Sequence, residues 1–206
     1  GLIFTTISEQ GLGVLLSYGR LICVLVGTML FVALVLNPIV TFICTRQNPY
    51  PLVLRCLKDS GLTAFFTRSS AANIPVNMEL CKDLGLDEDT YSISIPLGAT
   101  INMDGTAIYQ CVATVFLATC AGMHLTLGQM VLVVVTATLA SIGTAGVSGA
   151  GMIMLAMVLE AIGIPVAYIG LIVAVDRLFD MGRTCLNVTG DIACSLCVTK
   201  WESKKK

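Results

Sequence analysis

Long apolar runs dominate this chain and restrict it to a lipid environment. Residues 21–44, 93–120, 129–159 and 165–198 each exceed the roughly 20 apolar residues that a helix needs to cross the hydrocarbon of a bilayer. Hydrophobic residues make up 56% of the sequence and charged residues 12%, which is about half the charged share of a soluble domain. The sequence therefore predicts an all-α integral membrane protein.

Composition argues against several other classes of protein. Nine cysteines lie scattered in apolar segments, and the one CxxC pair, Cys194 and Cys197, has no second pair or neighbouring histidine to complete a zinc site. Ser148 lies in a glycine-rich stretch like that of serine proteases of the membrane, but the sole histidine, His124, is in a connection and supplies no base. The formal net charge is −1, without a basic, aromatic-rich patch. We expect neither an enzyme, nor a cofactor, nor a nucleic-acid partner.

The positions of lysine and arginine predict the orientation of the chain in the membrane. Basic residues follow the first and the last apolar run, whereas the connections 121–128 and 161–168 contain none, and Arg20 is the exception. The positive-inside rule then places the C-terminus in the cytoplasm of a multi-pass protein of the plasma (cell inner) membrane.

The same rule predicts two re-entrant hairpins. Both connections that flank residues 129–160 lie outside, so this glycine-rich segment enters and returns on the same side. Residues 50–86 are basic at both ends and form a second hairpin from the cytoplasmic face. Oppositely oriented hairpins, each followed by a long helix, are typical of an inverted repeat in transporters.

Polar residues interrupt the last apolar run at helical spacing. Asp176, Asp180, Arg183, Asn187 and Asp191 are three or four residues apart, so at ~100° per residue they share an arc of about 80°. Each intramembrane charge costs at least ~2.5 kcal/mol and usually marks a ligand or a pathway. A self-neutralising ladder of ion pairs between helices is the structural alternative. Three acids against one arginine leave surplus negative charge, which favours a cation site. Arg177 points away from this arc.

An earlier helix is also interrupted by polar residues. The polar residues are Asn102, Asp104 and Thr106. Pro96, Gly98 and Gly105 lie near them and loosen the helix backbone. Carboxylates, amide oxygens and freed backbone carbonyls are the hard ligands that small cations prefer, and broken helices in transporters present such groups.

Three motifs in order resemble a known family. NMDGT at 102–106, ASIGTAG at 140–146 and DMGRT at 180–184, continued by NVTGD at 187–191, closely resemble the glutamate and aspartate transporters of the dicarboxylate/amino acid:cation symporter family, prokaryotic members above all. The resemblance covers nearly the whole chain. It implies sodium-coupled symport of acidic amino acids by a homotrimer, in which a transport domain moves against a scaffold as an elevator.

The resemblance also implies a role for individual residues. Arg183 would hold the side-chain carboxylate of the substrate and Asp180 its amino group. The remaining substrate contacts would be Thr184, Asn187, Thr106, Ser70, Val147 and Gly151. One sodium site would use Asp191 with carbonyls of Gly98, Asn102 and Asn187. A second would use carbonyls of Thr100, Ser141, Ile142 and Thr144, and a third Asn102 and Asp104.

The chain departs from the family pattern at both hairpins. Ala71 replaces the last of three consecutive serines, and Ser148 stands where proline is usual, which predicts a looser gate. The expected organisation is the end of a scaffold helix and a connection at 1–20, a transport core at 21–200 and a cytoplasmic tail at 201–206. The core comprises a helix at 21–45, a hairpin at 50–86, a broken helix at 91–121, a hairpin at 129–160 and a polar helix at 165–199.

Several functions stay open on sequence alone. A proton-coupled glutamate or C4-dicarboxylate symporter fits the same motifs, and so does an inactive fragment of such a transporter, because the chain begins without methionine in hydrophobic sequence. A channel is a further alternative, since charged helices also line pores. Hairpins from both faces favour alternate closure over a continuous pore.

Overall fold

The computed structural model describes residues 13–203, and this part of the chain consists of helices and turns, with no strand. The prediction of an all-helical fold is therefore confirmed for these residues. The expected scaffold-helix end at 1–20 lies mostly outside the described residues, as do the lysines at 204–206.

One long apolar helix opens the described chain. It comprises α2 (Gly13–Phe31), the π-helical turn η1 (Val32–Leu36) and α3 (Asn37–Thr45). Pro38 accounts for the π turn, because proline lacks an N–H and its ring clashes with the carbonyl one turn back. The N–H of Asn37 donates to the carbonyl of Val32, five residues earlier. By length and composition, the 28 residues Tyr18–Thr45 can cross a membrane.

The next elements form a first helical hairpin. Its first arm is α4 (Tyr50–Cys56), the π turn η2 (Leu57–Gly61) and α5 (Leu62–Thr67), and its second arm is α6 (Ile74–Asp83). Arg68 adopts a left-handed conformation, with φ 54°, and ends α5 at the turn. We call the turn at residues 68–73 the first tip.

A buried polar cluster fixes this hairpin to the last helix. The amide of Asn73 donates to Ser60 Oγ over 2.7 Å and to Asn77 Oδ1 over 2.9 Å, and the Ser60 hydroxyl also bonds Asn77. The amide of Asn77 donates to the carbonyl of Val188 over 3.0 Å. These three side chains are at most 1% exposed. Buried polar groups need such partners, so the cluster holds both arms in register against the helix that contains Val188.

A broken helix follows the first hairpin. It comprises α7 (Glu88–Ile101) and α8 (Asp104–Cys120), separated by Asn102 and Met103 in non-helical conformations. Pro96 lies inside α7. The interruption therefore falls at the NMDGT motif.

The second helical hairpin comprises α9 (Leu127–Ile142) and α10 (Ala150–Ala161). α9 begins with a reciprocal capping box between Thr126 and Gln129, which satisfies backbone N–H groups at the helix end. We call the turn at residues 143–149 the second tip. It ends at Gly149, whose φ of 82° a residue with a side chain adopts with strain.

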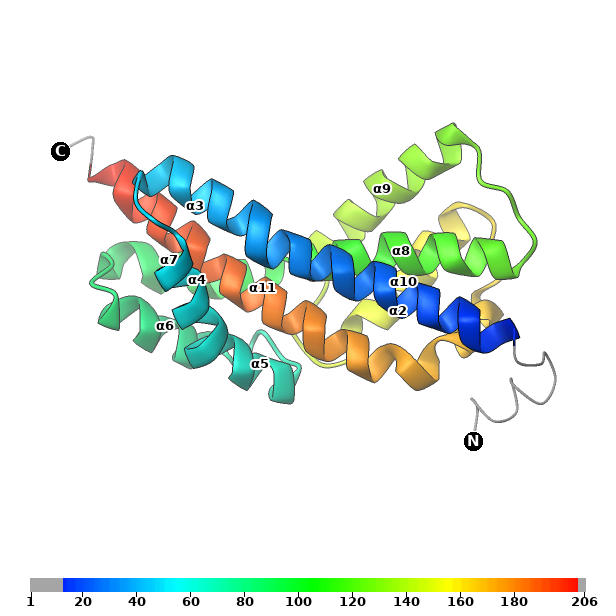
Figure 1. The fold of residues 1–206 in the computed structure, drawn as a ribbon, viewed down its shortest axis with the longest axis horizontal. Coiled ribbons are helices and arrows are strands. Elements are labelled where there is room, and N and C mark those ends of the chain that lie inside the picture. Colours follow the sequence, from blue (N-terminus) through cyan, green and yellow to red (C-terminus); the bar gives the residue numbers. More distant parts are fainter. Residues whose placement is uncertain (1–12, 204–206) are drawn as a thin grey trace.

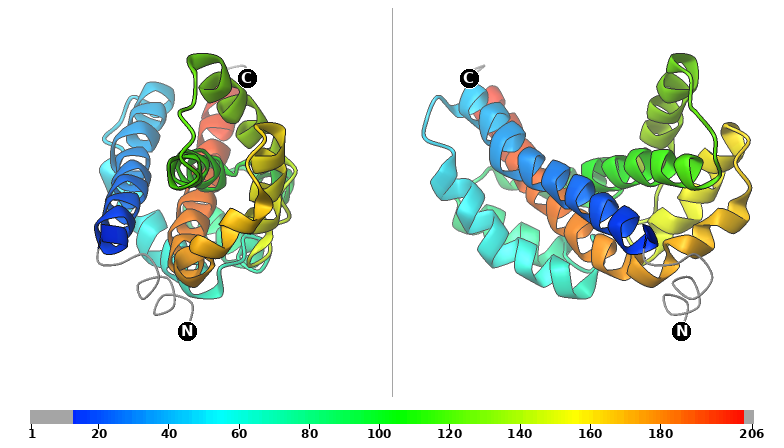
Figure 2. Two further views of the ribbon diagram at one scale, coloured as in Figure 1. Left: turned by 90° about the vertical axis from the view of Figure 1, so that its right-hand side faces the viewer. Right: turned by 45° about the vertical axis from the view of Figure 1, so that its right-hand side comes forward.

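The last elements are the short 3₁₀ helix η3 (Val166–Leu171) and the 30-residue α11 (Val173–Glu202). α11 contacts α7, α8, α5 and α3, and it passes through the middle of the bundle (Figure 1). The first hairpin lies at the end of the bundle near the C-terminus, and α9 and α10 lie at the opposite end (Figures 1 and 2).

Two apolar clusters flank the centre of α11. One gathers residues of α2, α8, α9 and α10 around Phe179 and Leu186. The other gathers residues of α4, α6 and α7 around Ile192. Because each cluster fixes a different hairpin against α11, the two tips are brought toward the same central stretch of that helix.

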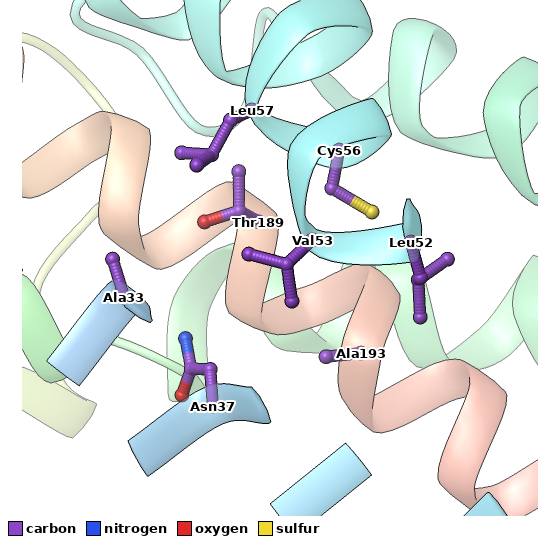
Figure 3. Close-up of a pocket in the computed structure, with 8 residues that line it drawn as sticks. All are labelled: Ala33, Asn37, Leu52, Val53, Cys56, Leu57, Thr189 and Ala193. Carbon is purple, nitrogen blue, oxygen red and sulfur yellow. The ribbon is translucent and has the colours of Figure 1, made fainter. Parts of the chain in front are cut away.

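A small gap marks the contact of both π turns with α11. Figure 3 shows Ala33 and Asn37 of the long helix, Val53 and Leu57 of the first hairpin and Thr189 of α11 around it. Its volume is about 10 Å³, room for roughly one water molecule. The π turns therefore widen the helices locally without opening a ligand site.

Replacement of Gly105 by alanine tests how closely α8 and α11 pack. A Cβ at this position would lie 2.5 Å from the carbonyl oxygen and 2.7 Å from the Cα of Arg183, both backbone atoms. We expect Gly105→Ala to destabilise the full-length protein by about 1–3 kcal/mol, the usual cost of overpacking. Thermal unfolding in detergent measures this. Gly128→Ala is the matched control, since a methyl group there would meet no heavy atom within 4 Å. Equal melting temperatures for both variants would contradict the close packing.

Candidate functional site

The polar arc of α11 faces the interior of the bundle. Four polar residues of the arc are 3–4% exposed, and Arg183 is 2% exposed; the four are Asp176, Asp180, Asn187 and Asp191. Arg177 is exposed, as its position off the arc predicts. Helical periodicity thus separates the two arginines of this helix into one buried and one surface residue.

Arg183 is enclosed by groups of this chain. Its Nε donates to Asp180 Oδ1 over 3.0 Å, and its Nη1 lies 3.3 Å from Asp176 Oδ1. The guanidinium carbon lies 4.3 Å from the centre of the Tyr109 ring, a cation–π distance. A Cβ on Gly151 would approach that carbon to 2.9 Å, so the backbone of α10 lies against the guanidinium as well. The guanidinium is held by two carboxylates and an aromatic ring.

Arg68 adds a second cation beside the polar arc. It comes from the first tip and places Nη1 3.8 Å from Asp180 Oδ2, so Asp180 faces both arginines while Asp176 pairs with Arg183. Asp191, the third acid of the arc, accepts a hydrogen bond from the Asn102 amide instead, so the predicted surplus of acid narrows to this residue. The ladder of ion pairs, which was the structural alternative, is present here. Sequence reasoning missed Arg68, although it is the one charged residue at the centre of the first hairpin.

A small polar cavity lies where both tips meet α11. All eight residues that the resemblance assigns to substrate line it, together with five that it does not. The first set is Ser70, Thr106, Val147, Gly151, Asp180, Arg183, Thr184 and Asn187, and the second is Arg68, Met103, Thr144, Ala145 and Gly146. The cavity measures about 10 Å³, room for roughly one water molecule. The two tips are thus closed over it.

Hydrogen bonds join the two tips directly. The carbonyl of Gly146 accepts from the Ser69 hydroxyl over 2.8 Å and from the Ala71 N–H over 2.9 Å. A Cβ on Gly146 would lie 2.7 Å from the carbonyl oxygen of Ala99, near the end of α7. Only glycine permits this approach of three backbone segments.

The second tip also bonds Asp180. The Ser148 hydroxyl donates to Asp180 Oδ2 over 3.2 Å, and the N–H of Gly149 donates to the same oxygen over 3.1 Å. Serine in place of the usual proline was expected to loosen this gate. The structure instead gives Ser148 a contact that proline cannot make.

The side chains of Asn187 and Thr184 form hydrogen bonds with other groups of this chain. Asn187 Oδ1 accepts from the N–H of Gly105 over 2.8 Å, and its Nδ2 donates to Thr106 Oγ1 over 3.2 Å. The Thr184 hydroxyl donates to the carbonyl of Asp180 over 2.7 Å. The start of α8 is therefore fixed to α11 beside the cavity.

The residues expected at the first cation site converge on Asp191. Asn102 Nδ2 donates to Asp191 Oδ1 over 2.9 Å and to the carbonyl of Asn187 over 3.2 Å. A Cβ on Gly98 would lie 2.5 Å from Asp191 Oδ1, so the backbone of α7 touches the carboxylate. An anionic oxygen among carbonyls suits a small hard cation.

The other expected cation ligands are less enclosed. Ser141, near the end of α9, and Thr144, at the second tip, are buried, whereas Thr100 and Ile142 are exposed. Asp104, in the first turn of α8, is exposed as well. Among the described residues, no three His, Cys, Asp or Glu side chains group as metal ligands.

Comparison with known proteins places the chain in a family. Residues 1–201 match the model of the sodium:dicarboxylate symporter family. The chain is 51% identical over 212 residues to the serine/threonine transporter SstT of Streptococcus agalactiae and 48% identical over 211 residues to that of Streptococcus thermophilus. Each match covers 100% of the chain and 52% of the relative, so the chain spans about half the length of these proteins. The chain therefore belongs to the sodium:dicarboxylate symporter family, whose members are membrane transporters and not enzymes.

Proposed function

We propose that the protein containing this chain is a sodium-coupled symporter of small neutral amino acids, serine and threonine in particular. The observation that carries this proposal is the enclosure of Arg183 by Asp176, Asp180, Tyr109 and Gly151. An arginine whose charge is already paired within the protein contributes little binding free energy to a substrate carboxylate. The names of the streptococcal relatives point the same way.

The charges around the cavity support a substrate without a net charge. Asp176 and Asp180 face Arg183 and Arg68, so this part of the site is balanced. A zwitterionic amino acid with a neutral side chain preserves that balance. An acidic side chain would bring an additional negative charge beside two buried carboxylates, which is costly at low dielectric.

Small polar groups in the cavity suit a hydroxyl side chain. Ser70 and Thr106 are buried and line it, and Thr106 Oγ1 accepts from Asn187. In the proposed complex Asp180 binds the substrate amino group, and Asn187 and Thr184 lie near its main-chain carboxylate. With Arg183 and Gly151 limiting the depth of the cavity, a short side chain fits better than a long one.

Acidic amino acids are the second candidate substrates. Arg183 lines the cavity, and its Nη2 makes no hydrogen bond although it lies 3.0 Å from Asp180 Oδ1. Release of Arg183 from Asp176 would let this nitrogen meet a substrate carboxylate bidentately.

The mechanism that we propose is alternating access of an elevator-type transport core. Residues 21–200 form this core, with re-entrant hairpins at 50–86 and 129–160 and the C-terminus in the cytoplasm. Sodium binds at Asp191 with carbonyls of Gly98, Asn102 and Asn187. Further sites use carbonyls at 100, 141, 142 and 144 and the side chains of Asn102 and Asp104. The homotrimer belongs to the full-length protein.

Substrate competition separates the two candidate substrate classes. In proteoliposomes with an inward sodium gradient, we expect unlabelled serine or threonine to inhibit labelled serine uptake at a concentration roughly tenfold or more below that of aspartate, a difference of at least about 1.4 kcal/mol. Succinate, without an amino group for Asp180, should inhibit least. Stronger inhibition by aspartate than by serine would replace this proposal with acidic amino acid transport.

The role of Arg183 is tested by its removal together with that of a partner. Arg183→Gln leaves buried Asp176 without its cation and Asp180 with Arg68 alone, and breaking such a buried pair costs about 3–5 kcal/mol. We expect a large fall in the melting temperature of the full-length protein and partial recovery in the double variant Arg183→Gln with Asp176→Asn. If Arg183→Gln unfolds like the wild type and loses only aspartate binding, the arginine is a substrate ligand.

Sodium dependence tests the assignment of Asp191. Asp191→Asn removes the one full negative charge of the first cation site but keeps an oxygen for the Asn102 amide. We expect the sodium concentration for half-maximal serine uptake to rise roughly tenfold or more, since 1.4 kcal/mol corresponds to a factor of about ten. Asp89→Asn, an exposed acid in the first turn of α7, is the matched control. An unchanged sodium activation curve for Asp191→Asn would make this carboxylate structural.

A further inference from the structure

Both carboxylate oxygens of Asp180 are used within the protein. Its Oδ1 accepts from Arg183, and its Oδ2 accepts from the Ser148 hydroxyl over 3.2 Å and the Gly149 N–H over 3.1 Å. Arg68 Nη1 lies 3.8 Å from Oδ2. With 4% of its surface exposed, Asp180 has no free oxygen for a substrate amino group.

The second tip aims two donors at the same oxygen. Gly149 precedes the first residue of α10, and its φ of 82° reverses the chain there. The N–H of Gly149 lies at the start of that helix, where negative charge is favoured. The side chain of the preceding residue, Ser148, lies beside it. We call these two hydrogen bonds to Asp180 Oδ2 the latch.

We propose that Ser148 determines substrate affinity by holding the second tip on Asp180 when no amino acid is bound. This inference rests on the proposed function, in which Asp180 takes the substrate amino group. An ammonium offers three donors and a full positive charge, whereas the latch offers one hydroxyl and one amide. Substrate therefore displaces the latch, and binding and latching compete for one carboxylate oxygen.

The competition sets the apparent affinity for substrate. When only the unlatched fraction binds, the apparent dissociation constant is the intrinsic one divided by that fraction. Loss of the Ser148 hydroxyl leaves the Gly149 N–H as the sole donor of the latch and shifts the equilibrium toward the unlatched form. Hydrogen bonds to charged groups lie at the strong end of the protein range, so we expect an apparent affinity for serine roughly three- to tenfold tighter.

The matched variants are Ser148→Thr, which keeps a hydroxyl, and Ser148→Val, which has nearly the shape of threonine without it. Ser148 is exposed, so both side chains fit at the surface of the tip. Ser148→Ala is a second variant without the hydroxyl, and Ser92→Ala, at an exposed serine of α7, controls for loss of a serine elsewhere.

Hydrogen–deuterium exchange in the full-length protein without any amino acid measures the latch directly. We expect peptides that cover residues 143–149 to exchange several-fold faster in Ser148→Val and Ser148→Ala than in wild type, Ser148→Thr and Ser92→Ala. Equal exchange in Ser148→Val and Ser148→Thr would overturn the latch. This measurement needs no substrate, so it stands even if serine transport fails.

Equilibrium binding and transport of serine measure the consequence. We expect Ser148→Val and Ser148→Ala to bind serine more tightly, with Ser148→Thr close to wild type. Unchanged affinity together with faster exchange at the tip would overturn the competition for Asp180. Absence of serine binding and uptake in the wild type would instead refute the proposed function, and the exchange data would still decide whether the latch exists.

Discussion

The fold depends on burying a charged stripe of one helix without leaving its charges unpaired. α11 carries Asp176, Asp180 and Arg183 into the bundle, where an isolated charge would be prohibitively costly. Arg183 pairs with both acids on its own helix, the Tyr109 ring lies against its guanidinium, and Arg68 reaches in from the first tip. Each hairpin therefore supplies a partner for Asp180: Arg68 comes from the first, and the Ser148 hydroxyl and the Gly149 N–H come from the second. The contacts that close the two tips over the cavity also stabilise the buried charges of α11.

Interrupted helices turn this structural requirement into candidate binding chemistry. At 102–103 the chain leaves the helical path, and the Asn102 amide bonds the Asp191 carboxylate and a carbonyl of α11. At the second tip the interruption between α9 and α10 leaves the Gly149 N–H free to donate to Asp180. The break at 102–103 places backbone groups and the Asn102 amide around the Asp191 carboxylate, and the second tip directs two hydrogen-bond donors at Asp180. The proposed cation site at Asp191 and the proposed amino acid site at Asp180 thus lie close together along one helix.

Glycines make these approaches possible. Gly98, Gly105, Gly146 and Gly151 each occupy a place where a methyl group would meet Asp191, the backbone of Arg183, the carbonyl of Ala99 or the Arg183 guanidinium. The sites consequently depend on backbone contact as much as on side-chain chemistry. Close backbone contact explains why glycine occupies these four positions.

The sequence by itself determined the helices and the arc of α11, because periodicity and the cost of charge in lipid are local properties. Eight of the residues that line the cavity were predicted through the resemblance of its contiguous motifs to a family. It also located the break at 102–106 and the turns of both hairpins through their polar and glycine residues. Only the tertiary structure decided how the charges pair. Arg68 is distant from Asp180 in sequence, and nothing in the α11 pattern shows that Arg183 is shared by two acids and closed by Gly151. A count of charges along one helix cannot include partners contributed by another, so the sequence located the surplus acid on the whole arc, whereas the structure leaves it at Asp191.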